Sequence, residues 1–157
     1  GDVYKRQDQN MLTSIEMIKA VIDSMVMNKF GRIVNITSGS VKSPIPELGL
    51  SNGARSGLTG FVAGIAREYA QYNVTINNLL PGQFNTARIE NLIESRAKEE
   101  GIAPQKLRAS LERENPSRRL GEIVEFGFAC AWICSAHSGY LVGQNILLDG
   151  GVFNSTH

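Results

Sequence analysis

The chain has few of the features that mark secreted, membrane or nucleic-acid-binding proteins. Two of its 157 residues are cysteine, its formal net charge is +1, and it contains no run of apolar residues long enough to cross a membrane. No secretory signal is evident. We therefore expect a cytoplasmic protein that takes neither a nucleic acid nor a membrane as its partner.

A glycine-rich phosphate loop between a strand and a helix is also missing. Residues 1–7 resemble the in-frame translation of a transposase adaptor used in sequencing libraries, and we expect them to be foreign to the protein. A natural polar tail is the alternative. With the first interpretation, residues 8–157 are a partial domain from a reading frame truncated on its N-terminal side.

The two cysteines lie four residues apart in a helical pattern. Cys130 and Cys134 could bind a metal ion together with His137. A structural zinc site has four ligands at characteristic spacings, which these residues do not provide. We favour two small apolar residues on a buried helix face in a reducing compartment, and no metal site.

What the chain does contain is a strand–helix–strand pattern between residues 31 and 89. Residues 32–38 are an apolar β-rich run expected to be buried on both faces, 51–72 are helical, and 73–80 form a second strand. A last strand is expected at 143–148. This is the unit of a parallel sheet, in which ligands bind at the carboxyl ends of the strands. The fold class is therefore α/β.

Two helices carry distinctive periodic patterns. Residues 11–27 place five apolar side chains on one face, and Gly31 is expected just past the helix end: Met11, Ile15, Ile18, Ile22 and Met25. The helix at 51–72 has a stripe of glycines. Glycine costs about 1 kcal/mol per interior helix position relative to alanine, so we expect a close backbone approach along the stripe: Gly49, Gly53, Gly57, Gly60 and Gly64.

Two further helical regions follow. Residues 89–113 are highly charged, which favours a solvated helical pair with a break near residues 101–104. Residues 122–135 form the last helix, and we expect Trp132 to pack against the rest of the protein. Its apolar stripe is Ile123, Phe126, Ala129, Cys130 and Ile133.

Several motifs in this order resemble the short-chain dehydrogenase/reductase family, in particular its 3-oxoacyl-acyl-carrier-protein-reductase-like members. Ser38 matches the family's catalytic Ser, and thirteen residues later Ser51-Asn52-Gly53-Ala54-Arg55 occupies the Tyr-x-x-x-Lys frame. Pro81-Gly82-Gln83-Phe84-Asn85-Thr86 fits the family's Pro-Gly-x-x-x-Thr, and Asp149-Gly150-Gly151 fits its closing Asp-Gly-Gly. The resemblance covers residues 10–153.

This resemblance implies the C-terminal half of a doubly wound, Rossmann-type sheet, with about three strands and crossover helices. It also implies NAD or NADP as cofactor, a small carbonyl or alcohol substrate, and a homodimer or homotetramer formed through the helix at 51–72. The resemblance also implies that the charged segment at 89–113 is a mobile substrate lid. Four of its apolar residues could line a pocket: Leu92, Ile93, Ile102 and Leu107.

The resemblance assigns roles residue by residue. Ser38 would hydrogen-bond the substrate oxygen. Asn10 would help to hold a proton-relay water, although an Asn at a helix start is equally typical of a cap. Pro81, Gly82, the backbone near Phe84 and the Thr86 hydroxyl would hold the nicotinamide carboxamide.

The chain departs from the family at its two most diagnostic positions. Ser51 is a shorter and far less acidic group than the family's Tyr. Arg55 keeps the positive charge and can still hydrogen-bond a ribose, but a guanidinium does not release a proton. The catalytic candidates are therefore Asn10, Ser38, Ser51 and Arg55, with Arg55 also binding the cofactor.

Three functions remain open at this point. The first is an oxidoreductase with an altered proton-transfer group, the second a non-catalytic dinucleotide binder, and the third a structural or interaction subunit that has kept only the fold. An upstream glycine-rich loop would favour the first two. We also expect this chain by itself to be marginally stable or prone to aggregation, because the strand at 32–38 exposes an apolar edge.

Overall fold

The computed structural model describes Lys5 and residues 7–156, so the proposed adaptor segment 1–7 lies mostly outside the described residues. Three parallel strands form the sheet in the order β1-β2-β3: β1 (Gly31–Ile36), β2 (Val74–Pro81) and β3 (Asn145–Leu148). The helices of the described chain are η1 (Asp8–Leu12), α2 (Thr13–Met27), η2 (Gly39–Val41), η3 (Pro46–Leu48), α3 (Gly49–Ala70), α4 (Ala87–Glu100), α5 (Pro104–Glu114), α6 (Ile123–Ile133) and η4 (Ala136–Ser138).

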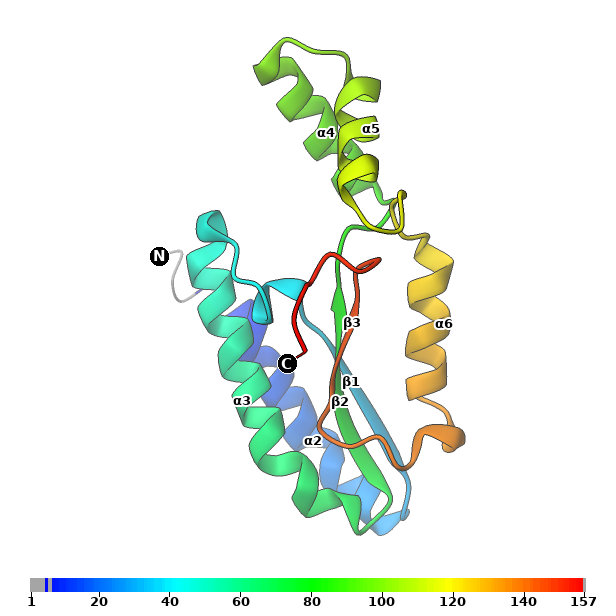
Figure 1. The fold of residues 1–157 in the computed structure, drawn as a ribbon. Coiled ribbons are helices and arrows are strands. Elements are labelled where there is room, and N and C mark those ends of the chain that lie inside the picture. The colour runs from blue at the N-terminus through cyan, green and yellow to red at the C-terminus, as the bar shows by residue number, and fades with distance from the viewer. Residues whose placement is uncertain (1–4, 6, 157) are drawn as a thin grey trace.

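The sheet lies between two layers of helices. α2 and α3 cover one face and α6 covers the other (Figure 1). This arrangement confirms the predicted α/β fold with a parallel sheet and crossover helices. None of the helices among the described residues is long and apolar enough to cross a membrane.

The main core lies between β2 and the α2–α3 layer, and the predicted apolar face of the first helix contributes to it. Its fully buried members are Ile18, Ile22, Leu58, Val62, Ala66, Val74 and Ile76. Met11, Ile15 and Met25 pack around them. Each large side chain buried in this way stabilises the fold by about 1.5–3 kcal/mol.

Burial differs sharply between neighbouring strands. Residues 74–80 of β2 are all buried, because β1 and β3 flank this strand and helices cover both faces. The prediction that the first strand is buried on both faces is wrong: Ile36 is 52% exposed. Within the described chain β1 pairs only with β2, so its other edge is open.

The end of α2 also differs from the prediction. Gly31 is the first residue of β1, and Lys29 (φ 51°) takes the left-handed conformation that reverses the chain. Glycine is still needed at position 31, since a Cβ there would lie 2.6 Å from the Met25 sulfur. The reason is close packing against the preceding helix, not the backbone conformation.

The glycine stripe of α3 makes one close approach. A Cβ at Gly57 would lie 2.5 Å from the Met11 sulfur on η1. The other four glycines of the stripe have no atom within 4 Å of the same position. The expected close approach within the chain therefore holds at Gly57 alone.

α4 and α5 form the predicted helical pair, and Gly101 (φ 67°) makes the break between them. The prediction that four apolar residues line a pocket is contradicted for two of them, Ile93 and Leu107. Ile93 and Leu107 are buried in a small core between the two helices, and Ile102 packs against it. Only Leu92 is exposed and available to a ligand.

α6 contacts the sheet along one side only. Ile133 is buried there and Phe126 is half-buried. Ile123 and Trp132 were expected to pack, but both are largely exposed, with Trp132 53% exposed. The apolar composition of this helix therefore does not report how much of it is buried.

Candidate functional site

The polar groups predicted to be functional lie at the carboxyl edge of the sheet. The register pairs Ile36 with Leu79, and Pro81 with Leu148, so the three strands end close together. A Cβ at Gly39 would contact both the Leu147 side chain, at 3.4 Å, and the Pro81 carbonyl, at 3.5 Å. The loop after β1 therefore lies against the ends of β2 and β3.

Ser38 begins this loop as the N-cap of η2. Its Oγ accepts a hydrogen bond from the Ser40 amide at 3.1 Å. Because a hydroxyl can accept and donate at once, the Ser38 hydrogen is left to donate to a ligand oxygen. This is the direction of bonding that polarising a carbonyl requires.

Two buried hydroxyl groups flank Ser38. The oxygens of Thr37 and Ser40 have no hydrogen-bond partner within the described chain. A buried polar group without a partner is costly, and native proteins usually satisfy it with water or a ligand. Both oxygens are closed off from the surface in this structure, so they mark a strained polar spot next to Ser38 and do not by themselves identify a ligand.

Ser51 and Arg55 lie in the first two turns of α3, whose packing against η2 brings them to the side of the sheet where Ser38 lies. Ser51 is only 5% exposed, and the Arg55 guanidinium donates a hydrogen bond to its Oγ. An aliphatic hydroxyl is far less acidic than a phenol, and burial disfavours its anion, so Ser51 is a poor proton donor even beside a cation. The structure thus brings the pair together without giving Ser51 the role of the family's Tyr.

Asn10 lies inside the helical turn η1 and is half-buried. The cap interpretation is wrong, because Gln7 precedes η1 and Leu12 precedes α2. The helix simply begins earlier than the apolar pattern indicated. η1 packs against α3, so Asn10 is on the same side of the molecule as Arg55, and its water-holding role stays a prediction.

The loop after β2 is fixed by backbone hydrogen bonds on both sides. Gly82 donates to the Leu148 carbonyl at 2.8 Å, and Asn85 donates to the Gly121 carbonyl at 2.8 Å. A Cβ at Gly82 would lie 2.6 Å from that of Asp149, so only glycine allows the approach. The segment 81–86 is therefore held rigidly between β3 and the segment before α6.

Phe84 and Thr86 are two of the predicted ligand-binding residues in this loop, and their side chains are used differently. The Phe84 ring packs edge-on against Phe126, at 5.2 Å between centroids, and covers Gly121. Any ligand contact of Phe84 is therefore left to its backbone. Thr86 is the N-cap of α4, and its Oγ accepts from the Ile89 amide at 3.4 Å, which leaves the hydroxyl hydrogen free to donate.

The Asp-Gly-Gly motif forms the turn after β3. The Asp149 carboxylate accepts from the amides of Gly151, at 2.9 Å, and Phe153, at 2.8 Å. Gly150 and Gly151 both have positive φ, of 72° and 94°, which favours glycine. The motif is a structural support for the carboxyl edge of the sheet.

Sequence reasoning missed a buried amide that supports this edge. Asn115 donates from Nδ2 to the Asp149 carbonyl at 3.0 Å, and its Oδ1 accepts from the amide and hydroxyl of Ser117. It lines a small cavity of about 110 Å³ together with Gln83 and Arg119. The available signal was an Asn at a helix end followed by Pro116, which is also an ordinary turn pattern.

One ion pair borders this cavity. The Arg119 guanidinium makes two hydrogen bonds of 2.6 Å with the Glu125 carboxylate. With an added bond from the Glu122 amide, it lowers the pKa of Glu125 to about 2. Both charged groups therefore persist through the physiological pH range.

The cysteines do not form a metal site with their neighbours. Within the described residues no group of three His, Cys, Asp or Glu side chains could hold a metal ion. Cys130 is half-buried and Cys134 is exposed, which corrects the expected burial of both. Desolvation and the neighbouring Cys130 raise the pKa of the Cys134 thiol.

The groups at this edge are of the kind that the nicotinamide end of a dinucleotide would need. A carboxamide needs one donor and one acceptor, and the Thr86 hydroxyl with the loop backbone can provide them. Arg55 adds a cation next to the same edge.

Comparisons with known proteins agree with this geometry. Residues 2–153 match the family described as enoyl-(acyl carrier protein) reductase. The chain is 30% identical over 147 residues to the NADPH-dependent reductase BacG of Bacillus subtilis, a match covering 94% of this chain and 57% of that protein. It is 32% identical over 150 residues to the 3-oxoacyl-[acyl-carrier-protein] reductase FabG of Haemophilus influenzae, covering 94% and 57%.

A solved structure gives the same result for the fold. The crystal structure of YwfH, an NADPH-dependent reductase involved in bacilysin biosynthesis, superposes with a TM-score of 0.87 at 29% identity, covering 95% of this chain and 57% of that one. The chain thus spans a little over half the length of the relatives it matches. By its sequence match and its fold, it belongs to the short-chain dehydrogenase/reductase family.

Proposed function

We propose that the full-length protein is an NAD(P)-dependent oxidoreductase acting on a carbonyl or alcohol substrate, with a proton-transfer group other than the side chain at position 51. The observation that carries the proposal is the Ser38 hydroxyl, whose oxygen accepts from the Ser40 amide and whose hydrogen is left to a ligand. The relatives support the cofactor, since the curated relative BacG and the solved structure of YwfH are both described as NADPH-dependent reductases.

The roles of the chain's own residues follow from their contacts. Ser38 donates a hydrogen bond to the substrate oxygen and stabilises the negative charge that develops there. Thr86 and the Gln83–Asn85 backbone orient the carboxamide. Arg55, with its permanent charge, orients the ribose and favours an anionic oxygen nearby.

The bound cofactor supplies the hydride in the direction of carbonyl reduction. The proton on oxygen comes from solvent water in this proposal, because Arg55 does not release a proton and Ser51 is buried under it. A water at Asn10 is a suitable relay, since η1 packs on the same helix. We expect slow turnover, as positioned general acids typically contribute 10²–10⁴-fold.

The alternative is a dinucleotide binder without turnover. The observation that favours it is the hydrogen bond from Arg55 to the buried Ser51, which leaves no acidic side chain at the position of the family's Tyr. Both functions predict saturable cofactor binding. They differ in whether a carbonyl compound is reduced.

The test is a titration of the full-length protein with NADH and NADPH, followed by nicotinamide fluorescence. Saturable binding of either supports both functions, and oxidation of the bound cofactor by a compound from a carbonyl panel selects the first. No binding of either contradicts both and favours an interaction subunit that has kept the fold alone.

A gain-of-activity variant makes the test sharper. Ser51→Tyr combined with Arg55→Lys restores the family's general acid, and we expect turnover to rise by about 10²-fold or more. The matched control is Ser51→Phe with Arg55→Lys, which adds the same ring without its hydroxyl. Equal rates in the two double variants would contradict the proposed role of this position.

The proposal includes a homodimer or homotetramer in which α3 packs against its counterpart. Four glycines of its stripe are free of contacts on the outer side, which leaves room for a close helix approach. Gly53→Leu and Gly60→Leu should each lower the mass measured by light scattering. Gly127→Leu on α6 is the control, and an unchanged mass in all three would contradict this interface.

A further inference from the structure

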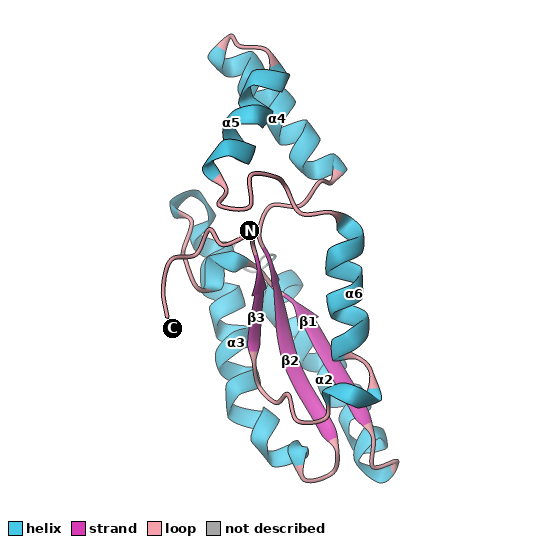
Figure 2. Cartoon of the chain, turned by 45° about the vertical axis from the view of Figure 1, so that its right-hand side comes forward, coloured by secondary structure: helices cyan, strands magenta, loops and turns pink. Residues whose placement is uncertain are grey.

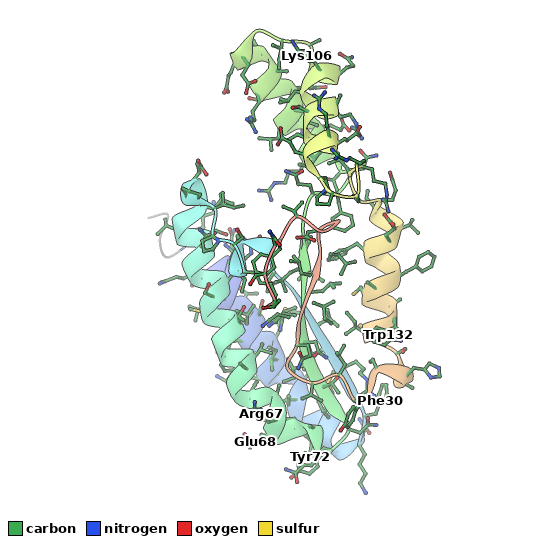
Figure 3. All side chains as sticks on the ribbon, in the orientation of Figure 1. Phe30, Arg67, Glu68, Tyr72, Lys106 and Trp132 are labelled. Atoms are coloured by element: carbon green, nitrogen blue, oxygen red, sulfur yellow. The ribbon has the colours of Figure 1, made fainter. Side chains whose placement is uncertain are left out.

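The α4–α5 pair is attached to the rest of the protein by few contacts. It has its own small core and stands beyond the carboxyl edge of the sheet (Figure 2), with Lys106 near its far end (Figure 3). Its two connections to the sheet are the loop before Ala87 and the segment after Glu114. The side chains near these connections therefore decide how the pair is oriented.

One side chain joins the pair to the loop after β2. Arg108, on α5, donates from Nη2 to the Asn85 Oδ1 at 3.0 Å. It also bonds Glu90, in the first turn of α4, and Glu112, one turn along its own helix at 3.1 Å. Its three bonds thus reach three separate segments of the chain.

Three hydrogen bonds, and not burial, hold the Arg108 side chain in place. Its side chain is 29% exposed, and the hydrogen bonds with Glu90 and Glu112 raise its pKa, so it stays charged. Two carboxylates hold the guanidinium in place while its remaining edge faces Asn85. The planar fork of an arginine suits such a three-way junction, and a lysine could not reproduce it.

Asn85 links Arg108 to the predicted carboxamide site. It lies between Phe84 and Thr86, and its amide is bonded to Gly121 at 2.8 Å. The Asn85 side chain is therefore held at one end by the rigid loop and at the other by Arg108. Any shift of α5 relative to the sheet must stretch this bond.

We propose that Arg108 is a positioning residue that couples the orientation of the α4–α5 pair to the Gln83–Thr86 loop through Asn85. This inference rests on the proposed function, in which that loop holds the nicotinamide end of the cofactor. Binding at the loop then stabilises the orientation of the helix pair that Arg108 holds, and this orientation in turn strengthens binding at the loop. The coupling is reciprocal, as linkage requires.

The experiment measures both ends of the coupling in the full-length protein. Arg108→Gln should raise the dissociation constant of NADPH by about three- to tenfold, the low end of typical couplings because the junction is partly solvated. It should also reduce the hydrogen-exchange protection that NADPH gives to residues 87–114. Arg108→Lys keeps the charge but loses the fork, and should restore little of either effect.

A matched control and a double-mutant cycle separate coupling from a general loss of structure. Arg96→Gln removes an arginine of the same helix pair whose bond is the exposed one to Glu100, and should leave both readouts unchanged. Asn85→Ala should weaken NADPH binding, and adding Arg108→Gln to it should cause little further loss. The coupling would be overturned if the losses in NADPH affinity from Asn85→Ala and Arg108→Gln were additive. It would also be overturned if NADPH protected residues 87–114 from hydrogen exchange in Arg108→Gln as fully as in the unmodified protein.

The outcomes also distinguish this inference from the proposed function. If the unmodified protein binds neither NADH nor NADPH, the proposed function fails and the coupling to the cofactor fails with it. If it binds NADPH and Arg108→Gln binds it equally well, the coupling alone is overturned. Thermal unfolding of each variant checks that the Arg108 variants are folded.

Discussion

At the scale of single residues, close packing explains why glycine stands at several points of the carboxyl edge. Gly82 approaches Asp149, Gly121 lies under the Phe84 ring, and a Cβ at Gly150 would meet the side chains of Asn115 and Ser117. The motif resemblance identified two of these three positions. The structure adds the atoms that each glycine must avoid.

Replacing Gly82 with Ala should therefore destabilise the protein. The new Cβ would lie 2.6 Å from the Asp149 Cβ, and the backbone on both sides is hydrogen-bonded in place. We expect a loss of about 1–3 kcal/mol in the free energy of unfolding measured with urea. Gly127→Ala, in an open helical position, should be neutral or slightly stabilising, and equal losses in the two variants would contradict the packing argument.

The pKa of Glu125 is the second prediction at this scale. The Arg119 guanidinium holds the pKa of this carboxyl at about 2, well below the usual 4.5. The pair therefore contributes stability above pH 4.5, and the contribution is lost as the pH falls toward 2. Both side chains are exposed, so the effect on stability is small and the pKa itself is the readout.

Carbon-detected NMR titration of the carboxyl should show this low pKa. In Arg119→Gln it should rise toward the usual range. Arg118→Gln is the control, since the Arg118 guanidinium bonds the Arg113 carbonyl and not Glu125. A Glu125 pKa near 4.5 in the unmodified protein would contradict the bidentate pair.

At the scale of elements, a row of three amides, two buried and one half-buried, crosses the sheet. The register aligns Asn35 with Asn78 and Asn78 with Asn145. Asn35 donates to Asn78 at 3.1 Å, and Asn78 donates to Asn145 at 2.8 Å. These bonds fix the register of three strands whose other contacts are mostly apolar and so tolerate slippage.

Asn78→Ala should be clearly more costly than Asn145→Ala. The first removes both bonds and leaves the buried Asn35 and the half-buried Asn145 without their partner, for a loss of about 2–4 kcal/mol, whereas the second removes one bond and should cost about 1 kcal/mol. Urea unfolding of both variants measures the difference. Equal losses would show that the row does not act as a connected unit.

At the scale of the whole molecule, the open edge of β1 is the dominant surface feature. A groove of about 450 Å³ runs along it between α2 and α6, and Met17, Val21 and Ile36 expose apolar surface there. The unpaired edge is a template for strand addition. This supports the expectation that the chain by itself is marginal or prone to aggregation.

Ile36→Lys should raise the concentration at which this chain aggregates, because a charge on an edge strand opposes pairing with another copy. Light scattering during concentration measures the onset. Ile45→Lys is the control, as Ile45 is similarly exposed but lies in a loop outside the sheet. A cooperative thermal unfolding transition of a monomer of this chain would contradict the expectation of marginal stability.

The sequence by itself determined the order of helices and strands, the parallel sheet and the family. These depend on local periodicity, turn residues and motif spacing, which are properties of neighbouring residues. The apolar face of the first helix and the break at Gly101 were predictable for the same reason.

Only the tertiary structure decided which apolar surfaces are covered and which polar groups meet. Trp132 faces solvent although we expected it to pack, and Leu107 is buried although the family resemblance implied that it could line a pocket. Arg108 reaches Asn85 across 23 residues, and the Asn35–Asn78–Asn145 row spans all three strands. Such contacts depend on how separate elements are placed in space, and no local pattern along the chain encodes that placement.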